Sequence, residues 1–407
     1  MIQHQARPEQ ARTVLRGRAV TETEVLEDAV VVVDGPELAY AGPAAGYAPA
    51  PADETVDLAP DQVLVPGLVD LHCHGGYGVD FSGADAAEAR RGIDAIHAAG
   101  TTTLLASVVT SPPETLHRQL EMLAGLAGEG LIAGMHLEGP FLSEARCGAQ
   151  DPRWLLAPDE ELAAALIGSA RGFLRTMTYA PELPGADGLV RLLARRGVVP
   201  SLGHTAAVPE SAAESLALAG RELAGAGGPV SAARPTVTHL FNGMDPLHHR
   251  SPGAVSACLR AARAGTAAVE LIADNVHLDP QLVAAMFELL GAQNILLVTD
   301  AMAAAGLDDG DYRLGPAEVT VREGTARVAA TGAIAGGTAG MLDLVRNAVG
   351  AGVGLADAVA SATVVPARVL GREKEIGSLV AGGHADLLVL GPGLELQRVM
   401  RRGQWIR

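Results

Sequence analysis

Eight apolar, β-branched segments alternate with Ala-rich segments through the middle of the chain. Their starts recur at roughly 30–40 residues, which is the spacing of strand–helix units. The predicted strands are residues 63–71, 101–110, 131–137, 175–180, 198–202, 236–241, 267–273 and 295–299. Eight such units over about 300 residues predict an α/β protein with a closed (β/α)₈ barrel of the TIM type rather than an open, doubly wound sheet.

The two ends of the chain have a different pattern. Residues 11–62 contain short strand candidates broken by Gly and Pro, and residues 374–407 again read as short strands with tight turns. We therefore expect the two ends to pair into one small β-sandwich domain beside the barrel. The predicted limits are residues 1–62 and 371–407 for the two parts of the small domain and residues 63–370 for the barrel.

The composition narrows the class of partner. Apolar residues make up 48% of the 407 residues, which is enough for a large core, and the formal net charge is −17. Nucleic acid and anionic membranes require a basic surface, so we expect neither as a partner. No apolar run is long enough to span a membrane, the N-terminal segment lacks an apolar signal region, and the three cysteines are scattered. These features predict a cytoplasmic protein with reduced thiols.

Ionisable side chains stand at the ends of six predicted strands, where a (β/α)₈ enzyme carries its catalytic groups. His72 and His74 are two residues apart, so on a strand they point to the same face. The other residues at strand ends are Glu138, His204, His239, His277 and Asp300. Taken singly, a strand His is more often a hydrogen-bonded core residue, and an Asp after an apolar run is often a helix N-cap. Together they would be costly to bury without partners, and a metal ion would satisfy them at once.

The predicted ligands are imidazoles and carboxylates, with no paired cysteines. That set suits Zn²⁺, Fe²⁺ or Mn²⁺ at a hydrolytic site with an open position for water. Asp300 is the candidate general base, which would accept a proton from that water and return it to the leaving group. His136 lies two residues before Glu138 and would either orient a ligand or pack in the core.

Two segments resemble sequence motifs of the amidohydrolase superfamily. They are "PGLVDLHCHG" at the first predicted barrel strand and "GSLVAGGHADLLVL" where the chain returns to the predicted small domain. Some members of that superfamily bridge two metals through a carboxylated lysine on a barrel strand. Lys374 is the single lysine of this chain and lies outside the predicted barrel, so that subclass is excluded. The resemblance then implies that Glu138 serves in place of the lysine.

The resemblance narrows to the N-acetylglucosamine-6-phosphate deacetylase family. It is carried by "HLEGPFLSEARCGAQDP", "LGHT", "VTHLFNGMDPLHHRSPG", "ADNVH" and "VTDAM", and it covers nearly the whole chain. It implies hydrolysis of the acetamide of N-acetyl-D-glucosamine 6-phosphate to D-glucosamine 6-phosphate and acetate, in amino-sugar catabolism and cell-wall recycling. It also implies one or two divalent metal ions per subunit, with zinc favoured over iron, manganese or cobalt.

The resemblance also implies site residues, position by position. The implied metal ligands are Glu138, His204 and His239 for a principal site, and His72 and His74 for a second site. Asp300 matches the catalytic aspartate. The implied substrate-binding residues are Asn242, Gly243, Arg250, His277, Ala149 and Gln150. In the family the arginine reaches across a dimer interface, which implies a homodimer, and Gln150 stands where the family often has His.

Arg250 has physical support as a phosphate ligand as well. An acidic protein that binds a dianion needs local positive charge, and "DPLHHRSPG" supplies an arginine with two histidines. Without the resemblance, a solvated surface arginine would be the simpler interpretation. The Gly-rich segment at residues 333–341 also has two interpretations, a flexible loop or a wall of the substrate pocket.

Two other kinds of function stay open. One is a different amidohydrolase, such as an N-acetylgalactosamine-6-phosphate deacetylase or a cyclic amidase. The other is a non-catalytic protein that binds a sugar phosphate on an old enzyme scaffold. The presence of Asp300 beside the predicted ligands argues against the second alternative, because a binding protein needs no general base.

Overall fold

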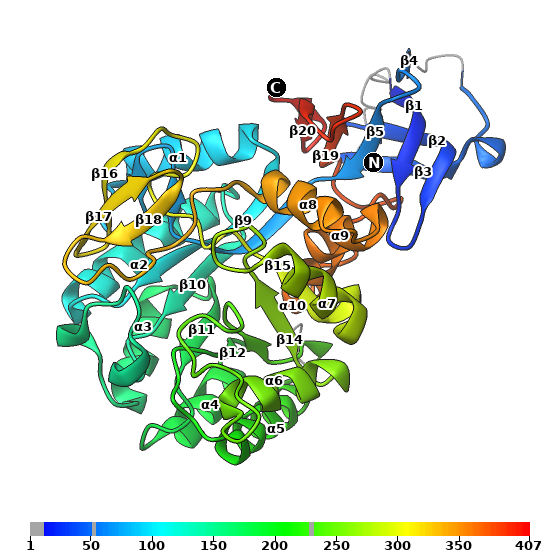
Figure 1. The fold of residues 1–407 in the computed structure, drawn as a ribbon. Coiled ribbons are helices and arrows are strands. Elements are labelled where there is room, and N and C mark those ends of the chain that lie inside the picture. Colours follow the sequence, from blue (N-terminus) through cyan, green and yellow to red (C-terminus); the bar gives the residue numbers. More distant parts are fainter. Residues whose placement is uncertain (1–11, 51–53, 228–231) are drawn as a thin grey trace, which may run out of the picture.

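Residues 12–50, 54–227 and 232–407 of the protein are described from a computed structural model. The protein consists of a large barrel of strands and helices with a smaller sheet beside it (Figure 1). The residues of the expected small domain that fall at positions 1–11 and 51–53 lie outside the described residues. Within the described residues, no helix is both long enough and apolar enough to cross a membrane.

Eight parallel strands follow one another around the barrel in chain order. They are β6 (Leu68–Cys73), β9 (Thr101–Val109), β10 (Gly134–Glu138), β11 (Leu174–Tyr179), β12 (Val199–Leu202), β13 (Thr236–Val237), β14 (Ala268–Leu271) and β15 (Ile295–Leu297). The segment after β15 returns to β6, where Cys73 and Ala301 form a parallel bridge. This contact closes the ring, so the predicted (β/α)₈ barrel is confirmed.

Buried Asp70 holds the two ends of the ring together. Its Oδ1 accepts the backbone N–H groups of His72 (3.2 Å) and Thr299 (3.3 Å), and its Oδ2 accepts the Thr299 hydroxyl at 2.5 Å. Asp70 is 1% exposed, and this burial raises the pKa of its carboxyl to about 6 although the Thr299 hydroxyl acts in the opposite direction. The carboxyl therefore ties β6 directly to the segment that follows β15.

Helices cover the outside of the barrel, as the Ala-rich segments predict. They are α1 (Ala86–Ala98), α2 (Pro113–Gly128), α3 (Glu160–Ser169), α4 (Ala186–Arg195), α5 (Pro209–Ala226), α6 (Gly253–Arg263), α7 (Pro280–Leu290), α8 (Met341–Gly350), α9 (Leu355–Ser361) and α10 (Val364–Val369). In α1 the start is set by a capping box, in which Asp85 and Glu88 satisfy each other's backbone N–H groups. The same helix buries Ile93 and Ile96 against the barrel core.

Both ends of the chain contribute to one small sheet, as predicted. Its strands are β1 (Thr13–Val20), β2 (Val25–Asp34), β3 (Glu37–Pro43), β4 (Glu54–Asp57), β5 (Val63–Pro66), β19 (Leu387–Leu390), β20 (Leu396–Arg401) and β21 (Gln404–Trp405). The two ends meet where β5 pairs with β19 in antiparallel register. The residue limits given above for the domains stay a prediction.

The first predicted strand, residues 63–71, is divided in the structure. Its first part is β5 of the small sheet, and its second part is β6 of the barrel. Gly67 separates them, and a Cβ atom there would lie 2.1 Å from the Thr102 hydroxyl. The chain can therefore pass from one sheet to the other so close to β9 because this residue has no side chain.

A three-stranded antiparallel sheet, which was not predicted, follows β15. It consists of β16 (Gly310–Leu314), β17 (Ala317–Arg322) and β18 (Thr325–Val328). In Figure 1 it is the yellow element beside α1 and α2. Its apolar face packs on Val109 at the end of β9 and on Met302 after β15. It therefore covers part of the edge at which the barrel strands end. The hairpin of β7 (Gly75–Gly76) and β8 (Val79–Asp80) lies close to α1.

Candidate metal centre

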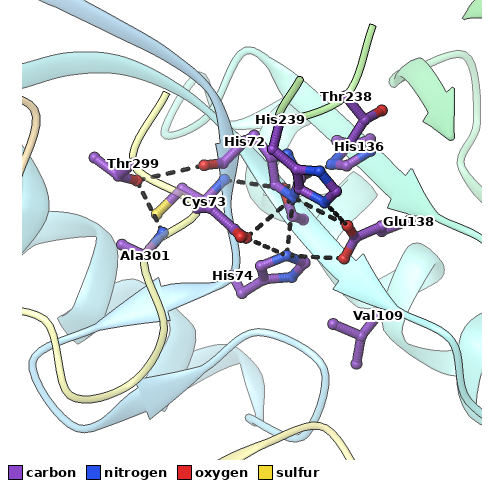
Figure 2. A network of polar contacts seen from close by, with 12 residues as sticks. His72, Cys73, His74, Val109, His136, Glu138, Thr238, His239, Thr299 and Ala301 are labelled. Atoms are coloured by element: carbon purple, nitrogen blue, oxygen red, sulfur yellow. Dashed lines mark hydrogen bonds and ion pairs between the residues drawn. The ribbon is translucent and has the colours of Figure 1, made fainter. Parts of the chain in front are cut away.

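Six of the ionisable residues predicted at strand ends converge at the C-terminal edge of the barrel. Figure 2 shows His72, His74, His239 and Glu138 turned toward one another. All six are at least nine-tenths buried, and they form two groups whose ligand atoms lie within 4.8 Å of one another. The groups are Glu138, His204 and His239, and His72, His74 and Asp300.

The first group is held by three short contacts. Glu138 Oε1 lies 3.0 Å from His204 Nε2 and 3.0 Å from His239 Nε2, and the two imidazole nitrogens are 3.1 Å apart. Glu138 is the last residue of β10, whereas the histidines follow β12 and β13. Three donor atoms from three strands therefore point at one position, which is the arrangement of a metal site with an open coordination position.

The second group has the same form. His72 Nε2 and His74 Nε2 are 3.0 Å apart, and Asp300 Oδ1 lies 3.2 Å from the first and 3.1 Å from the second. Asp300, predicted as a catalytic base alone, thus also lies within reach of an ion that these histidines would hold. Cys73 points away from the group and donates toward the Gly75 carbonyl (3.4 Å), as its place between the two histidines predicts.

Glu138 stands between the two groups. Its Oε1 belongs to the first group, whereas its Oε2 lies 3.2 Å from His74 Nε2. His72 Nε2 is 3.7 Å from Oε1. One carboxylate can therefore contact both positions, which is the place that the sequence resemblance implies for it.

Residues behind the ligands orient the imidazole rings. Glu270 Oε2 lies 3.0 Å from His72 Nδ1 and accepts the backbone N–H of His239 at 3.1 Å. The Arg146 carbonyl lies 2.8 Å from His204 Nδ1. Such partners fix which ring nitrogen faces a metal. Sequence reasoning missed Glu270, although a carboxylate inside the apolar run 267–273 was a usable signal.

His136 belongs to this buried layer but not to the ligand groups. Its Nδ1 lies 3.0 Å from the Ser107 hydroxyl and its Nε2 lies 2.8 Å from the Thr178 hydroxyl. Its ring meets the His72 ring edge to face, with centroids 4.4 Å apart. Burial and the neighbouring His72 hold the pKa of His136 well below its ordinary value. Of the two sequence interpretations, the structure favours a packed, hydrogen-bonded core histidine that supports a ligand by contact.

The electrostatics of the groups fit a cation. Burial opposes the ionisation of Glu138, but His72, His204 and His239 outweigh it and hold the pKa of the carboxyl well below its usual range. Burial likewise opposes protonation of His74, yet Asp300 and Glu138 raise its pKa to about 9. These carboxylates thus favour positive charge between them, which a divalent ion would supply without protons. The Nδ1 atoms of His74 and His239 have no hydrogen-bond partner among the described residues.

Three of the six residues have an unusual backbone conformation. The φ angles are 47° at His204, 26° at His239 and 46° at Asp300. Residues other than glycine rarely adopt positive φ, and each such position costs on the order of 1–3 kcal/mol. The chain turns sharply where β12, β13 and β15 end, and these turns direct the side chains across the mouth of the barrel.

A cavity of about 250 Å³ lies over the two groups. It is lined by nearly all of the predicted site residues: His74, Glu138, Ala149, Gln150, His204, His239, Asn242, Gly243, His277 and Asp300. His72 lies beneath it and is completely buried. Residues that were not predicted individually also contribute, namely Gly148, Leu314, Ala333, Ile334 and Gly336. The segment 333–341 therefore supplies part of the wall rather than only a flexible loop.

Apart from buried His72, Arg250 is the one predicted site residue that does not line this cavity. Its side chain is exposed and its Nη1 lies 2.8 Å from Nε2 of neighbouring His249. Within the cavity, His277 Nδ1 lies 2.8 Å from Asp274 Oδ2, and the Asn242 amide donates to the His239 carbonyl at 3.3 Å. Arg250 is thus placed where it cannot be assigned to the cavity of its own chain.

Gln150 contacts a predicted metal ligand. Its amide Nε2 donates to Glu138 Oε2 at 2.5 Å, and its Oε1 accepts the backbone N–H of Thr110 at 2.9 Å. Gln150 is 6% exposed and Thr110 is fully buried. The side chain therefore holds the outer carboxylate oxygen of Glu138 as well as lining the cavity.

Comparisons with known proteins show which family this chain resembles over most of its length. The model of the amidohydrolase family matches residues 63–406. Human N-acetylglucosamine-6-phosphate deacetylase is 34% identical over 371 residues, which are 87% of this chain and 86% of the human one. The N-acetylgalactosamine-6-phosphate deacetylase of Escherichia coli O157:H7 is 35% identical over 350 residues, which are 84% of this chain and 87% of the relative.

A solved structure is similar over almost the whole chain. The N-acetyl-D-glucosamine-6-phosphate deacetylase of Mycobacterium smegmatis, as a variant in complex with N-acetyl-D-glucosamine-6-phosphate, superimposes with a TM-score of 0.88 at 37% identity. The match covers 98% of this chain and 100% of the other. The deacetylase from Pasteurella multocida superimposes with a TM-score of 0.86 at 25% identity.

The contact between Gln150 and Glu138 gives a stability prediction. Gln150→Ala removes the donor to Glu138 and leaves the buried N–H of Thr110 without its acceptor. We expect the free energy of unfolding to fall by roughly 1–3 kcal/mol in urea denaturation with a chelator present. The control Gln281→Ala lies on an exposed face of α7 and should change the value by less than about 0.5 kcal/mol. Equal effects of the two substitutions would contradict this account of Gln150.

Proposed function

The chain belongs to the amidohydrolase family, and on that premise we propose that it hydrolyses the acetamide of N-acetyl-D-glucosamine 6-phosphate to D-glucosamine 6-phosphate and acetate. One observation carries the proposal beyond family membership. Two groups of three ligand atoms lie at the floor of a cavity large enough for one small substrate, and Glu138 of the first group also contacts His74 of the second. The deacetylases named above are similar over most of their length, and the reaction belongs to amino-sugar catabolism.

A divalent metal fits this site. We assign Glu138, His204 and His239 as the principal ligands, and His72 and His74, with Asp300 in reach, as the second set. When bound, such an ion polarises the substrate carbonyl and lowers the pKa of water. The mixture of imidazole nitrogens and carboxylate oxygens favours zinc, with iron, manganese and cobalt as alternatives.

Asp300 is the proposed proton carrier. It lines the cavity and is 8% exposed, so its carboxylate can reach a water molecule beside the substrate. Burial opposes its ionisation, but His72 and His74 outweigh that effect and hold the pKa of Asp300 below its ordinary value. The carboxylate is therefore ready to accept a proton from the attacking water at one oxygen and to donate it to the nitrogen of the departing amine.

The remaining cavity residues would bind the sugar. Asn242, Gly243, His277, Ala149 and Gln150 present hydrogen-bonding groups or backbone around the cavity. We propose Arg250 as the phosphate ligand of a neighbouring subunit, because it is exposed and lies outside the cavity of its own chain. A homodimer follows from that role. The cytoplasm is the proposed compartment, and the free Cys73, Cys147 and Cys258 are compatible with it.

N-acetyl-D-galactosamine 6-phosphate is a second candidate substrate. The specific observation in its favour is the 35% identity to a deacetylase named for that sugar. Gln150 bears on the choice, since it lies on the cavity wall where it could contact a sugar hydroxyl. The two sugars differ only in the direction of one hydroxyl group, so a single hydrogen bond can separate them.

Acetate release from defined substrates tests the proposed function. We expect the purified protein to release acetate from N-acetyl-D-glucosamine 6-phosphate with a kcat/KM at least tenfold above that for N-acetyl-D-galactosamine 6-phosphate. The unphosphorylated sugar should be poorer still, because it lacks the dianion. A reversed order of the two phosphates would select the second candidate, and no release from either would overturn the assignment.

Asp300→Asn tests the proton carrier. The substitution keeps the size of the side chain but removes its basicity, so we expect kcat to fall by roughly 10²–10⁴-fold. Circular dichroism and the melting temperature would verify that the fold is retained. Asp357→Asn, in an exposed turn of α9, is the matched control and should leave kcat unchanged. Full activity of Asp300→Asn would exclude this role.

The number of bound metal ions tests the second ligand group. Replacement of both His72 and His74 by Ala removes two of its three members and leaves Glu138, His204 and His239 in place. We expect a loss of about one metal equivalent per chain in elemental analysis after zinc loading and desalting. His117→Ala, on α2 and away from the cavity, should keep the wild-type metal content. An unchanged count in the double variant would contradict the two-metal assignment.

A further inference from the structure

A second polar cavity lies at the opposite edge of the barrel. It has a volume of about 190 Å³ and is bounded by the beginnings of β9, β10 and β11, where Thr102, Ala133 and Arg175 contribute to its wall. The other wall comes from the C-terminal part of the chain, around β19 and β20. The cavity therefore sits where the barrel meets the small sheet, and the residues of the candidate metal centre take no part in it.

Positive side chains dominate this cavity. Its lining includes Arg175, Arg372, Arg401, Arg402 and His384. Asp386 is the single carboxylate among the described residues that line it. In a chain with a net charge of −17, four arginines around one small cavity form a local positive field against the global one.

Two of the arginines are held rigidly by backbone groups. Arg401 donates to the carbonyls of Thr102 (3.0 Å), Gly130 (2.9 Å) and Leu131 (3.2 Å). Arg175 donates through Nε to the Ala133 carbonyl at 3.2 Å, and its guanidinium lies 5.8 Å from the centre of the Phe173 ring. These contacts orient the guanidinium groups without neutralising them, so the cavity is organised before any ligand arrives.

The available carboxylates do not balance the charge. Arg372 pairs with Glu375 at 2.9 Å, but more than half of the Glu375 side chain is exposed. Buried Asp386 accepts the backbone N–H of Arg402 at 2.6 Å. Arg175 and Arg402 have no acidic partner within 4.0 Å in the part of the chain that the structure describes. A ligand that brings negative charge would therefore remove an unfavourable interaction.

The ionisation behaviour of these groups points in the same direction. Burial and the charge of Arg372 hold the pKa of Arg175 below its ordinary value. Burial also lowers the pKa of Arg401, and Arg402 adds to this effect although Asp386 acts in the opposite direction. Burial, Arg402 and Arg372 likewise lower the pKa of His384, although Asp386 acts in the opposite direction. The cations thus repel one another across the cavity.

We propose that this cavity binds the phosphate group of a small anion, as inorganic phosphate or as a phosphate monoester. Guanidinium groups match phosphate through paired hydrogen bonds. The volume corresponds to roughly six water molecules at their share of liquid volume, which admits a phosphate group with part of its hydration shell. The site is separate from the proposed substrate site and its existence does not depend on the proposed activity.

Phosphate binding by the full-length protein tests this inference. The Arg250→Ala substitution removes the proposed phosphate ligand of the substrate site, so that site should no longer compete for phosphate. In that background, isothermal titration with inorganic phosphate at constant ionic strength should reveal one saturable site per chain. Adding Arg402→Gln or Arg175→Gln should raise the Kd for phosphate at least tenfold. It should also abolish the rise in melting temperature that phosphate causes. A second titration with glycerol 2-phosphate compares a phosphate monoester with the free ion. A lower Kd for inorganic phosphate would identify the free ion as the ligand, and a lower Kd for glycerol 2-phosphate would identify a monoester.

A matched control distinguishes binding at this cavity from the general effect of removing one positive charge. Arg398 lies on the same strand as Arg401, but its guanidinium stacks on the Trp405 ring at 3.6 Å and does not line the cavity. Arg398→Gln in the same background should leave the Kd for phosphate unchanged. Equal weakening by Arg398→Gln and Arg402→Gln, or the absence of saturable binding by either anion, would overturn the proposal. Because the readout is binding alone, failure of the proposed deacetylase activity would not affect it.

Discussion

The hydrogen bonds of buried Asp70 are the constraint on which the candidate metal centre depends. The first and last strands of a (β/α)₈ barrel are neighbours in space but far apart in the sequence. Here β6 and the segment after β15 are separated by more than two hundred residues. Asp70 bonds to Thr299 and to the backbone of His72, while Asp300 donates its N–H to the His72 carbonyl at 2.8 Å. The same contacts that close the barrel therefore set the separation of His72, His74 and Asp300.

Backbone strain at the strand ends accompanies the closure of the barrel. His204, His239 and Asp300 have positive φ, which an isolated turn would avoid. The barrel can hold them because the strands below are fully buried and their neighbours leave little freedom. Strain of this kind is typical of sites whose side chains must converge from separate strands rather than follow the direction of one.

The sequence was sufficient to predict the barrel and the set of residues at its strand ends. The reason is that strand–helix spacing is local, and parallel strands bring their ends to one edge whatever their exact register. It was not sufficient for contacts that arise only on folding. The support of His72 by Glu270 and the place of Asp300 beside two histidines join residues far apart in the chain. The pairing of Gln150 with Glu138 depends on how the loop after β10 folds back. The sheet of β16 to β18 was not predicted, although its strands alternate between buried and exposed residues and Gly-containing turns separate them.

The passage of the chain through Gly67 has a mechanical consequence. β5 is pinned in the small sheet by its pairing with β19, and five residues after Gly67 the same strand run reaches His72. Leu388 and Leu390 of β19 also pack in the main core of the barrel. Loss of β19 would thus remove the pairing partner of β5 and part of the packing against the barrel core at the same time. The small sheet therefore supports the strand that carries His72 and His74, so the geometry of the cavity floor depends on both ends of the chain.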